Sequence, residues 1–282
     1  MNRSHRAWIA IAIGMACATV AGASDLPRIG AIYYGKTLSA YGYPCTAADG
    51  AALMAIKSGG VEAARFDFGP LVGPGINYRL QINVVASGSG GDGTSVPEGG
   101  AIQIRATAGG QPVNLIGDTN IVVASGAVGR RDYILGADND GDGLPDEWEQ
   151  FCIDAMAALG MDVGVTTIAQ FDPNADYDGD NSSNQQEFHA GTLAFLGSDS
   201  LRIDQVTPGP QGTVRMRFLG NQGFSYQIIA SSNLVSGSWQ VARFGTAADS
   251  PTANNIVSGG GTLQNIYFPT NGFSQFLRLV VK

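Results

Sequence analysis

The chain has 282 residues, and its 24 Asp and Glu outnumber its 16 Lys and Arg, which gives a formal net charge of −8. An acidic surface of this kind repels phosphate groups, so nucleic acid and anionic membrane are not expected partners. Short runs of alternating apolar and polar residues, separated by glycine and proline turns, predict a mainly β protein of two small modules.

Residues 1–23 predict a secretory signal peptide. They combine a basic start, an apolar run from Ala7 to Val20 and a small-residue site that predicts cleavage after Ala23. The apolar run is too short for a membrane span, and no later segment approaches the length required. Loss of Arg3 and Arg6 with the leader takes the 16 basic residues to 14 against 24 acidic ones, a net charge of −10. We expect a secreted or periplasmic protein with no membrane span.

Residues 24–136 predict an N-terminal β-sandwich-like module of antiparallel strands. Strand patterns run from Asn77 to Val85 and from Ala101 to Ala106. Between them, the glycine-rich stretch from Ser87 to Gly100 lacks the lysine and the following helix that a phosphate-binding loop needs, which favours a mobile loop between strands. The module ends in RRDYILGA, which predicts a strand and a turn.

Residues 137–197 predict a calcium-binding segment, which begins with the stretch DNDGDGLPDEWE. Carboxylates fall at positions 1, 3, 5, 9 and 12 of this stretch and a glycine, Gly143, at position 6, which is the ligand pattern of an EF-hand loop. The glycine supplies the sharp turn. The predicted ligands are the side chains of Asp138, Asp140, Asp142, Asp146 and Glu149 and the backbone carbonyl of Leu144.

A second stretch, DYDGDNSSNQQE, repeats the pattern. Its predicted ligands are the side chains of Asp176, Asp178, Asp180, Asn184 and Glu187 and the backbone carbonyl of Ser182. Position 6 is Asn181 instead of glycine, and asparagine tolerates a left-handed backbone at some energetic cost. We therefore expect two calcium ions, the second bound more weakly than the first.

The alternative interpretation of these acids is a solvated, acidic surface. Two carboxylates about 4 Å apart repel each other by about 4 kcal/mol at an effective dielectric constant near 20. No Lys or Arg occurs from Asp132 to Leu201, so no cation of this segment neutralises the convergent acids. The ordered spacing of the acids therefore favours a metal ion.

A long helix is predicted directly after the first loop. Its apolar residues at helical spacing form one stripe: Trp148, Phe151, Cys152, Ala155, Met156 and Leu159. Asp146 and Glu149 fit a capping box, and Gly160 fits a C-terminal stop. A shorter helix from near Asn184 to Gly191 is predicted after the second loop. Because no helix is predicted to enter the first loop, we do not expect the helix-angle change of a calcium sensor.

The segment from Asp138 to about Thr192 resembles the thrombospondin type 3-like and dockerin-like calcium repeats of exported bacterial proteins. The matching stretches are DNDGDGLPDEWE and DYDGDNSSNQQEFHAGT, and the resemblance implies the two ligand sets given above. The start of the mature chain, with Gly35, Gly42 and Pro44, is faintly similar to transthyretin-like or carboxypeptidase-regulatory-like β-sandwiches.

Residues 198–282 predict a C-terminal β module, with a strand pattern from Arg215 to Leu219. Its segment GFSYQIIASSNL, ahead of Trp239, is similar to small β modules that follow such calcium repeats. Two cysteines remain after the leader, Cys45 and Cys152. A disulfide between them and two separate buried thiols are both compatible with an exported protein.

The leading functional hypothesis is a non-enzymatic exported protein in which calcium rigidifies the junction between two β modules. The first alternative is a carbohydrate- or cell-surface-binding module that presents Tyr33, Tyr34, Tyr41 and Tyr43, although alternating tyrosines are more often half-buried packing. The second is a dockerin-like protein that docks into a receptor. An enzyme is not expected, because no catalytic motif stands out and His189 is interpreted as a helix surface residue.

Overall fold

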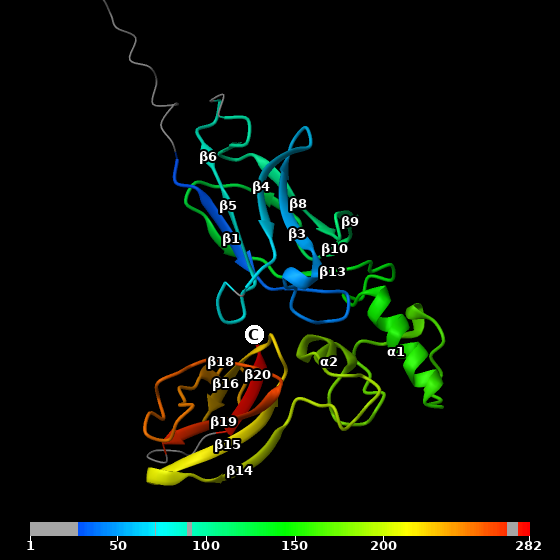
Figure 1. Cartoon of the computed structure of the whole chain (residues 1–282), viewed down its shortest axis with the longest axis vertical. Coiled ribbons are helices and arrows are strands. Elements are labelled where there is room, and N and C mark those ends of the chain that lie inside the picture. Colours follow the sequence, from blue (N-terminus) through cyan, green and yellow to red (C-terminus); the bar gives the residue numbers. More distant parts are fainter. Residues whose placement is uncertain (1–27, 71, 89–91, 270–275) are drawn as a thin grey trace, which may run out of the picture.

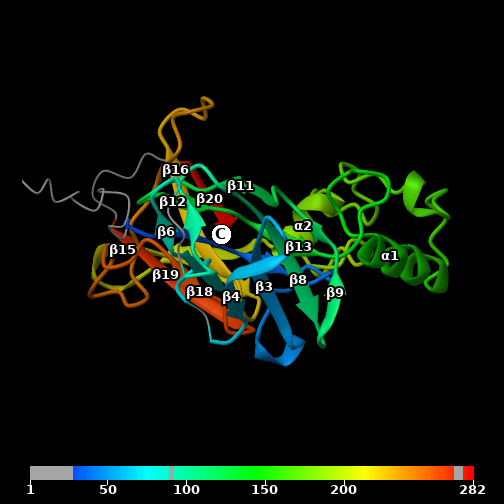
Figure 2. The same cartoon turned by 90° about the horizontal axis from the view of Figure 1, so that it is seen from above.

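The computed structural model describes residues 28–70, 72–88, 92–269 and 276–282. The predicted signal peptide and its cleavage site lie outside the described residues. The described chain is mainly β, as predicted, and has two α-helices. Two β regions lie one above the other, and the helices lie beside their junction (Figure 1). Seen from above, the helices project to one side of both β regions (Figure 2).

The N-terminal β region has one large sheet and several small ones. Its strands are β1 (Ala31–Gly35), β2 (Thr37–Leu38), β3 (Ala51–Lys57), β4 (Val61–Asp67), β5 (Tyr78–Ile82), β6 (Val84–Val85), β7 (Val96–Pro97), β8 (Ala101–Ala108), β9 (Gln111–Val113), β10 (Leu115–Ile116), β11 (Asn120–Val122), β12 (Val128–Arg130) and β13 (Tyr133–Leu135). The sheet orders are β11-β8-β3-β4 with β9 on β8, β12-β1-β5, β10-β13-β2, and the pair β6-β7. The strand patterns predicted at residues 77–85 and 101–106 are confirmed as β5, β6 and β8.

Alternation of side chains explains the core of this region. In β5, Tyr78, Leu80 and Ile82 are buried, whereas Arg79 and Gln81 are exposed. β8 alternates in the same way, so the buried faces of the sheets meet in one hydrophobic cluster. In these two strands one face therefore packs inward and the other faces solvent, as the sequence predicts.

Purely antiparallel pairing was predicted, and it is wrong for three strand pairs. β1 with β12, β2 with β13, and β6 with β7 run parallel. After β1 and β2 the chain forms the large sheet. It then returns as β12 and β13, which lie beside β1 and β2 and run in the same direction. Parallel neighbours need such long connections. The alternation of apolar residues along a strand carries no information about the direction of its neighbour.

The helical segment packs around one apolar cluster. It contains α1 (Asp146–Ala158), the short 3-10 helix η3 (Ile168–Gln170) and α2 (Asn184–Ala190). The ring centroid of Trp148 on α1 lies 5.6 Å from that of Phe171 and 5.2 Å from that of Phe188 on α2. Leu38 of β2 and Ile134 of β13 belong to the same cluster. The two loop-helix units therefore share a core that is continuous with the N-terminal β region.

The buried face of α1 differs in part from the predicted stripe. Trp148, Cys152 and Met156 are buried as predicted, but Phe151 and Leu159 are 42% and 61% exposed. Ile153 is buried in their place. Periodicity locates a helix but not the width of the surface that its neighbours cover. The short helix η3 is one of the elements that contact α1.

The predicted capping box of α1 is also wrong. The N-cap residue is Pro145, which has no side chain able to cap, and Asp146 is the first helical residue. The capping box occurs instead on α2, where the Ser183 side chain accepts from the backbone N–H of Gln186 and the Gln186 side chain accepts from the backbone N–H of Ser183. The second helix is therefore capped by residues between the predicted ligands of its loop.

The C-terminal β region has two sheets. Its strands are β14 (Ile203–Pro208), β15 (Thr213–Gly220), β16 (Ser225–Ser231), β17 (Gln240–Val241), β18 (Val257–Ser258), β19 (Thr262–Pro269) and β20 (Phe276–Val281). One sheet has the order β14-β15-β19; in the other, β16 pairs with β17 and β18 on one side and with β20 on the other. The strand pattern predicted at residues 215–219 is confirmed as β15. The residues between the sheets form a third hydrophobic cluster.

The three parts of the chain meet at the end of α2. Asn221, in the turn between β15 and β16, donates from Nδ2 to the carbonyl oxygens of Ala190 at 3.1 Å and of Gly191 at 3.0 Å. The next turn residues bring the ring of Phe224 to 6.4 Å from the ring of Tyr43, which belongs to the N-terminal β region. The end of α2 is thus fixed to the C-terminal β region, which in turn contacts the N-terminal one.

The two cysteines are separate, buried thiols. Cys45 lies in the cluster of the N-terminal β region and Cys152 in that of the helices. The disulfide alternative is therefore wrong.

No helix among the described residues combines the length and the apolar character that crossing a membrane requires.

Candidate metal centre

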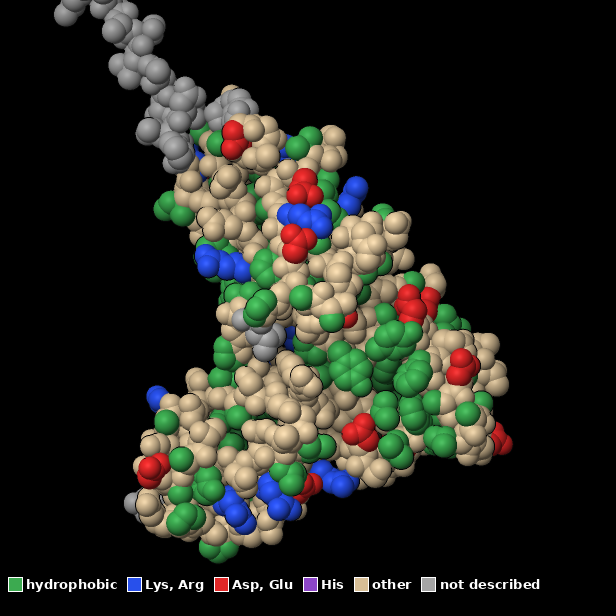
Figure 3. Space-filling view, in the orientation of Figure 1, with side chains coloured by type: hydrophobic (Ala, Val, Ile, Leu, Met, Phe, Trp, Pro, Cys, Tyr) green, Lys and Arg blue, Asp and Glu red, His purple; other side chains and the backbone are tan. Residues whose placement is uncertain are grey.

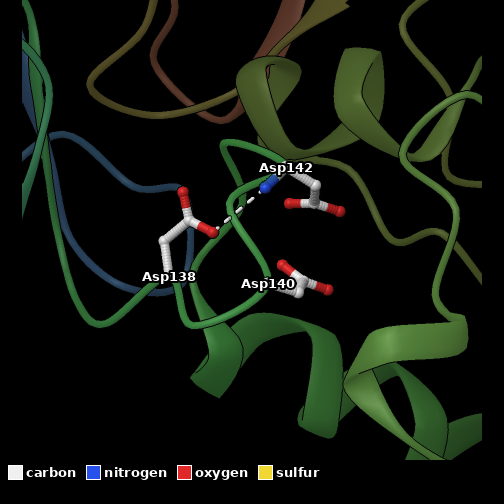
Figure 4. A group of neighbouring side chains, drawn as sticks. All are labelled: Asp138, Asp140 and Asp142. Atoms are coloured by element: carbon white, nitrogen blue, oxygen red, sulfur yellow. Dashed lines mark hydrogen bonds between the residues drawn. The ribbon is translucent and has the colours of Figure 1, made fainter.

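The first acidic loop folds around the side chain of Asp138. Its Oδ1 accepts hydrogen bonds from the backbone N–H groups of Gly141 at 2.7 Å and Asp142 at 3.1 Å, and its Oδ2 accepts from Gly143 at 3.2 Å. Carboxylate oxygens of Asp138, Asp140 and Asp142 all lie within 4.8 Å of one another. Figure 4 shows these three side chains on one tight turn of chain. The structure therefore brings the first three predicted ligands of this loop together.

The second loop repeats this hydrogen-bond pattern position by position. Asp176 accepts through Oδ1 from Gly179 at 2.8 Å and from Asp180 at 3.2 Å, and through Oδ2 from the N–H of Asn181 at 2.8 Å. Oxygens of Asp176, Asp178 and Asp180 again lie within 4.8 Å of one another. Two stretches with different intervening residues thus adopt one loop geometry, because both carry Asp at positions 1, 3 and 5.

Position 6 of each loop has a left-handed backbone. Gly143 has φ +95°, and a Cβ at this residue would meet nothing within 4 Å, so the glycine serves the backbone conformation and not a close approach. In the second loop, position 6 is Asn181, which has less backbone freedom than glycine but still has φ 76°. The sequence prediction that asparagine accepts this conformation in the second loop is confirmed.

Position 5 supports position 7 in both loops. Asp142 Oδ1 accepts from the N–H of Leu144 at 2.8 Å, and Asp180 Oδ1 accepts from that of Ser182 at 2.7 Å. The other oxygens of both aspartates, Oδ2, are buried and have no hydrogen-bond partner. Each aspartate therefore holds the turn with one oxygen and keeps the second one unpaired inside the loop.

The glutamates at position 12 are the most unusual groups in the described chain. Glu149 on α1 and Glu187 on α2 are both 0% exposed. Neither oxygen of Glu149 has a hydrogen-bond partner, and Oε2 of Glu187 has none, while its Oε1 accepts from Thr192 Oγ1 at 3.5 Å. A buried carboxylate without a partner is costly as an anion. Each glutamate needs either a proton or a cation beside it.

Burial and the neighbouring aspartates raise the pKa of both glutamates. The pKa of Glu149 rises from 4.5 to about 8, first by loss of solvent and then by the negative charge of Asp142. The pKa of Glu187 also rises from 4.5 to about 8, by burial and then by the charge of Asp178. Each glutamate therefore faces the acids at positions 3 and 5 of its own loop.

Position 9 differs between the loops. Asp146 accepts through Oδ1 from the backbone N–H of Asn139 at 2.9 Å, and through Oδ2 from the Nδ2 of the same residue, so both of its oxygens close the first loop. Asn184 is fully buried and donates from Nδ2 to the carbonyl of Asp172 at 2.7 Å, while its Oδ1 has no partner. Asn184 is thus better placed to offer an oxygen to an ion than Asp146 is.

Two further acids lie beside the loops, and the sequence pattern missed them. Asp172 contributes negative charge at Asp142 of the first loop, although it belongs to the approach to the second. Asp199 lies near Asp180, and its pKa is raised by burial and by that neighbour. Both lie outside the 12-residue pattern. The close approach of Gly197, where a Cβ would come within 3.2 Å of the carbonyl of Asp178, brings the chain after α2 back over the second loop.

In the part of the chain that the structure describes, no ion pair includes an acid of either loop. The groups that converge are hard oxygen donors, several of them buried and unpaired, with a glutamate closing each set. This donor set fits Ca²⁺, which takes six to eight oxygen ligands in a flexible geometry.

Other residues named from the sequence lie elsewhere. His189 is half-buried on α2, and its pKa is lowered by burial and by the charge of Lys36. Tyr33 is buried in the N-terminal core, Tyr34 is half-buried, and Tyr41 and Tyr43 are exposed.

No protein-family model matches the chain, and no curated protein matches it.

Proposed function

We propose that this is an exported, non-enzymatic protein that binds two calcium ions in thrombospondin type 3-like or dockerin-like loops, and that the ions rigidify the junction between its two β regions. The observation that carries this proposal is the pair of fully buried position-12 glutamates with unpaired oxygens, one in each of two loops that share one hydrogen-bond pattern. Export is inferred from the predicted signal peptide in residues 1–23.

The physical argument concerns what neutralises the buried acids. Convergent carboxylates repel one another, and Glu149 and Glu187 have lost the water that would stabilise their charge. A divalent cation at the centre of each loop replaces this water and turns the repulsion into attraction. The aspartates at positions 1 and 5 of both loops are held in place by backbone N–H groups, so little further ordering of these side chains is needed when an ion binds.

The second loop connects an ion to the junction. Glu187 lies on α2 one turn before Ala190 and Gly191, whose carbonyls accept from Asn221 of the C-terminal β region. A cation that fixes Glu187 therefore fixes the helix end that contacts the C-terminal region. The N-terminal region is tied to the same place by a buried hydrogen bond from the Gly75 N–H to Ser225 Oγ at 3.0 Å.

Thermal unfolding of the mature protein in EGTA and in calcium tests this proposal. At about 2 mM free calcium and a dissociation constant near 0.1 mM, each site stabilises the folded state by roughly 1.8 kcal/mol. We expect calcium to raise the midpoint in the wild type, and Glu149→Gln and Glu187→Gln each to lose part of the rise. Asp162→Asn, an exposed acid of the same segment, is the matched control and keeps the full rise. A wild-type midpoint that does not respond to calcium would contradict the proposal.

Glycan binding is the alternative function that a specific observation favours. The ring of Tyr41 lies 6.1 Å from that of Phe151, and both line a shallow, open cavity of about 690 Å³ that also includes Glu147 and Asp154. Hydrophobic side chains gather on the surface near the helices (Figure 3). Aromatic surface with a few convergent polar groups is the usual lining of a small-ligand site.

Affinity electrophoresis in gels that contain cellulose, xylan or alginate tests the alternative. A glycan site at this cavity predicts retardation of the wild type in one of the gels and its loss in Tyr41→Ala. Tyr43→Ala, whose side chain is equally exposed but does not line the cavity, is the control. Free migration of the wild type in all three gels would count against this function.

A further inference from the structure

A groove of about 540 Å³ lies between α2 and β20. One wall is formed by α2, with Gln185, Gln186 and His189, and the other by residues 278–281 of β20. Side chains of a strand alternate between the two faces of its sheet, so a groove over a face would contact every second residue. Contact with four consecutive residues places this groove along the edge of the strand.

β20 is an edge strand in the described part of the chain. It pairs with β16 on one side, and no described strand pairs with its other side. The Lys282 N–H donates to the Ser225 carbonyl at 2.9 Å, in register with the β16–β20 pairs. Along an antiparallel strand, the backbone N–H and C=O groups of successive residues point alternately to one side and to the other. In β20 these groups point away from β16, toward the groove, at Leu277, Leu279 and Val281.

The other side of β16 supports this assignment. The Ala242 N–H donates to the Ile228 carbonyl at 2.8 Å, so Ile228 directs its backbone groups to β17, away from β20. Its partner in the register with β20 is Leu279. The pair Ile228 and Leu279 is therefore a position where the two strands do not bond to each other, and Leu279 is left with an outward N–H and C=O.

One exposed charged side chain, a cation, is among the residues that line the groove. Among its lining residues, Arg278 is the one Lys or Arg, and its side chain is exposed, with the guanidinium 5.4 Å from the ring centroid of Trp239. Glu187 is the one acid, and its side chain is fully buried at the second loop. A bound segment would thus meet a cation and a row of unpaired backbone groups, with no exposed carboxylate opposing it.

We propose that this groove binds an extended segment of a partner protein, which adds as a strand along β20 and places an acidic side chain beside Arg278. Unpaired strand edges are templates for such strand addition, in which backbone hydrogen bonds give affinity and side-chain contacts give selectivity. Residues 278–281 span about 13 Å at roughly 3.3 Å per residue, so the segment is short. A second copy of β20 would bring its own Arg278 to the groove, which like-charge repulsion disfavours.

Two predicted calcium ligands, Ser182 and Glu187, are among the residues that line the groove, and α2, which carries Glu187, forms one of its walls. Under the proposed function, calcium at the second loop therefore helps to order this wall. Peptide binding is best measured in millimolar calcium, with the calcium-induced thermal shift recorded on the same samples. A failure of calcium binding and a failure of the groove then appear in two different readouts.

Fluorescence anisotropy with two labelled octapeptides of alternating Thr and Val tests the inference. One peptide has a central Glu and the other a central Lys. We expect saturable binding of the Glu peptide, tighter than that of the Lys peptide by about tenfold. Arg278→Glu, an exposed change, should invert this preference. No saturable binding of either peptide to folded, calcium-loaded protein, or an unchanged preference in Arg278→Glu, would overturn the proposal.

A second pair of variants tests the backbone contact. Leu279→Pro removes an outward N–H while the neighbouring residues keep their bonds to β16, and it should weaken binding of the Glu peptide by about tenfold. Leu279→Ala keeps the N–H and should bind within about threefold of the wild type. Thermal midpoints show that each variant is folded. Concentration-dependent dimers in sedimentation that Leu279→Pro abolishes would instead assign the groove to a second copy and refute the partner assignment.

Discussion

At the scale of single residues, Glu149 and Glu187 determine how stability depends on pH. The pKa of each is raised from 4.5 to about 8 in the folded chain. Between these values the folded state holds protons that the unfolded chain has released, so its free energy of unfolding in EGTA falls as the pH rises from about 4.5 to about 8. Calcium replaces the protons and removes this penalty.

We therefore predict that the rise in melting temperature on adding calcium grows between pH 5 and pH 8. Thermal unfolding at a series of pH values, with and without calcium, measures it. The double variant Glu149→Gln and Glu187→Gln has no charge to lose at these positions, so its stability in EGTA should depend less on pH in this range. A calcium effect that shrinks as the pH rises would show that protons and calcium do not compete at these glutamates.

Asn181 is the second residue whose role can be tested singly. Its φ of 76° is tolerated by asparagine but favours glycine. Asn181→Gly should leave stability within about 1 kcal/mol of the wild type, whereas Asn181→Val should cost about 1 to 2 kcal/mol, because a β-branched residue is strained in this conformation. Urea unfolding in calcium compares the three proteins. Equal stability of the glycine and valine variants would contradict the strained-turn interpretation.

The two thiols give a further prediction at this scale. Burial raises the pKa of Cys45 to about 12 and also raises that of Cys152. A buried thiol that stays protonated reacts slowly. The folded mature protein should react slowly with a thiol reagent at pH 8, and the unreduced protein in denaturant should yield two thiols at once. Fewer than two thiols in denaturant would mean that a disulfide forms after all.

At the scale of elements, α2 ends at Gly191, a glycine with a left-handed backbone. Gly191 has φ +67°, and a Cβ there would lie 2.4 Å from Cζ of Phe224. Gly160, after α1, has a similar φ of +71° but nothing within 4 Å of such a Cβ. A side chain at either position would be strained by the left-handed backbone. Of the two positions, only Gly191 would also place the side chain in a clash with the C-terminal β region.

Gly191→Ala should therefore lower stability by more than Gly160→Ala. We expect about 1 kcal/mol for the second, from the left-handed backbone alone, and about 1 to 3 kcal/mol more for the first, from overpacking at the junction. Denaturant unfolding of the two variants isolates the contact between α2 and Phe224. If both variants lose the same stability, the helix end does not bear on the junction.

Local sequence patterns predicted the individual strands and helices better than they predicted which elements pack or pair with one another. The loop turns, α2 and strands such as β5 follow from spacing within about a dozen residues, and all were predicted. The buried Ile153, the exposed Phe151 and the uncapped start of α1 depend on which surfaces pack against the helix. Parallel pairs such as β1 with β12 join residues nearly a hundred positions apart, and strand alternation cannot express them.

The same division applies to the candidate site. The aspartates at positions 1, 3 and 5 were found because one turn of chain brings them together. Asp199 and Asp172 were missed, because the fold and not the spacing places them beside the loops. The complete burial of Glu149 and Glu187 was also not predicted, since it depends on the shared core of the two helices.

At the scale of the whole molecule, the helical segment is a connector between two β regions. Its core is continuous with β2 and β13 on one side, and its second helix is hydrogen-bonded to Asn221 on the other. Calcium at the two loops would stiffen both connections. We predict that limited proteolysis in EGTA cuts between residues 160 and 200, and that millimolar calcium protects this segment. Equal cleavage in both conditions would indicate a junction that is rigid without the ion.

Calorimetric titration of the calcium-free mature protein with calcium tests the central claim most directly. The two loops predict two ions bound per chain in the wild type and one in each of Glu149→Gln and Glu187→Gln, with the double variant binding none. Asp162→Asn should bind two. A wild-type protein that binds no calcium at millimolar concentration, or glutamine variants that bind as many ions as the wild type, would contradict the assignment of these loops as calcium sites.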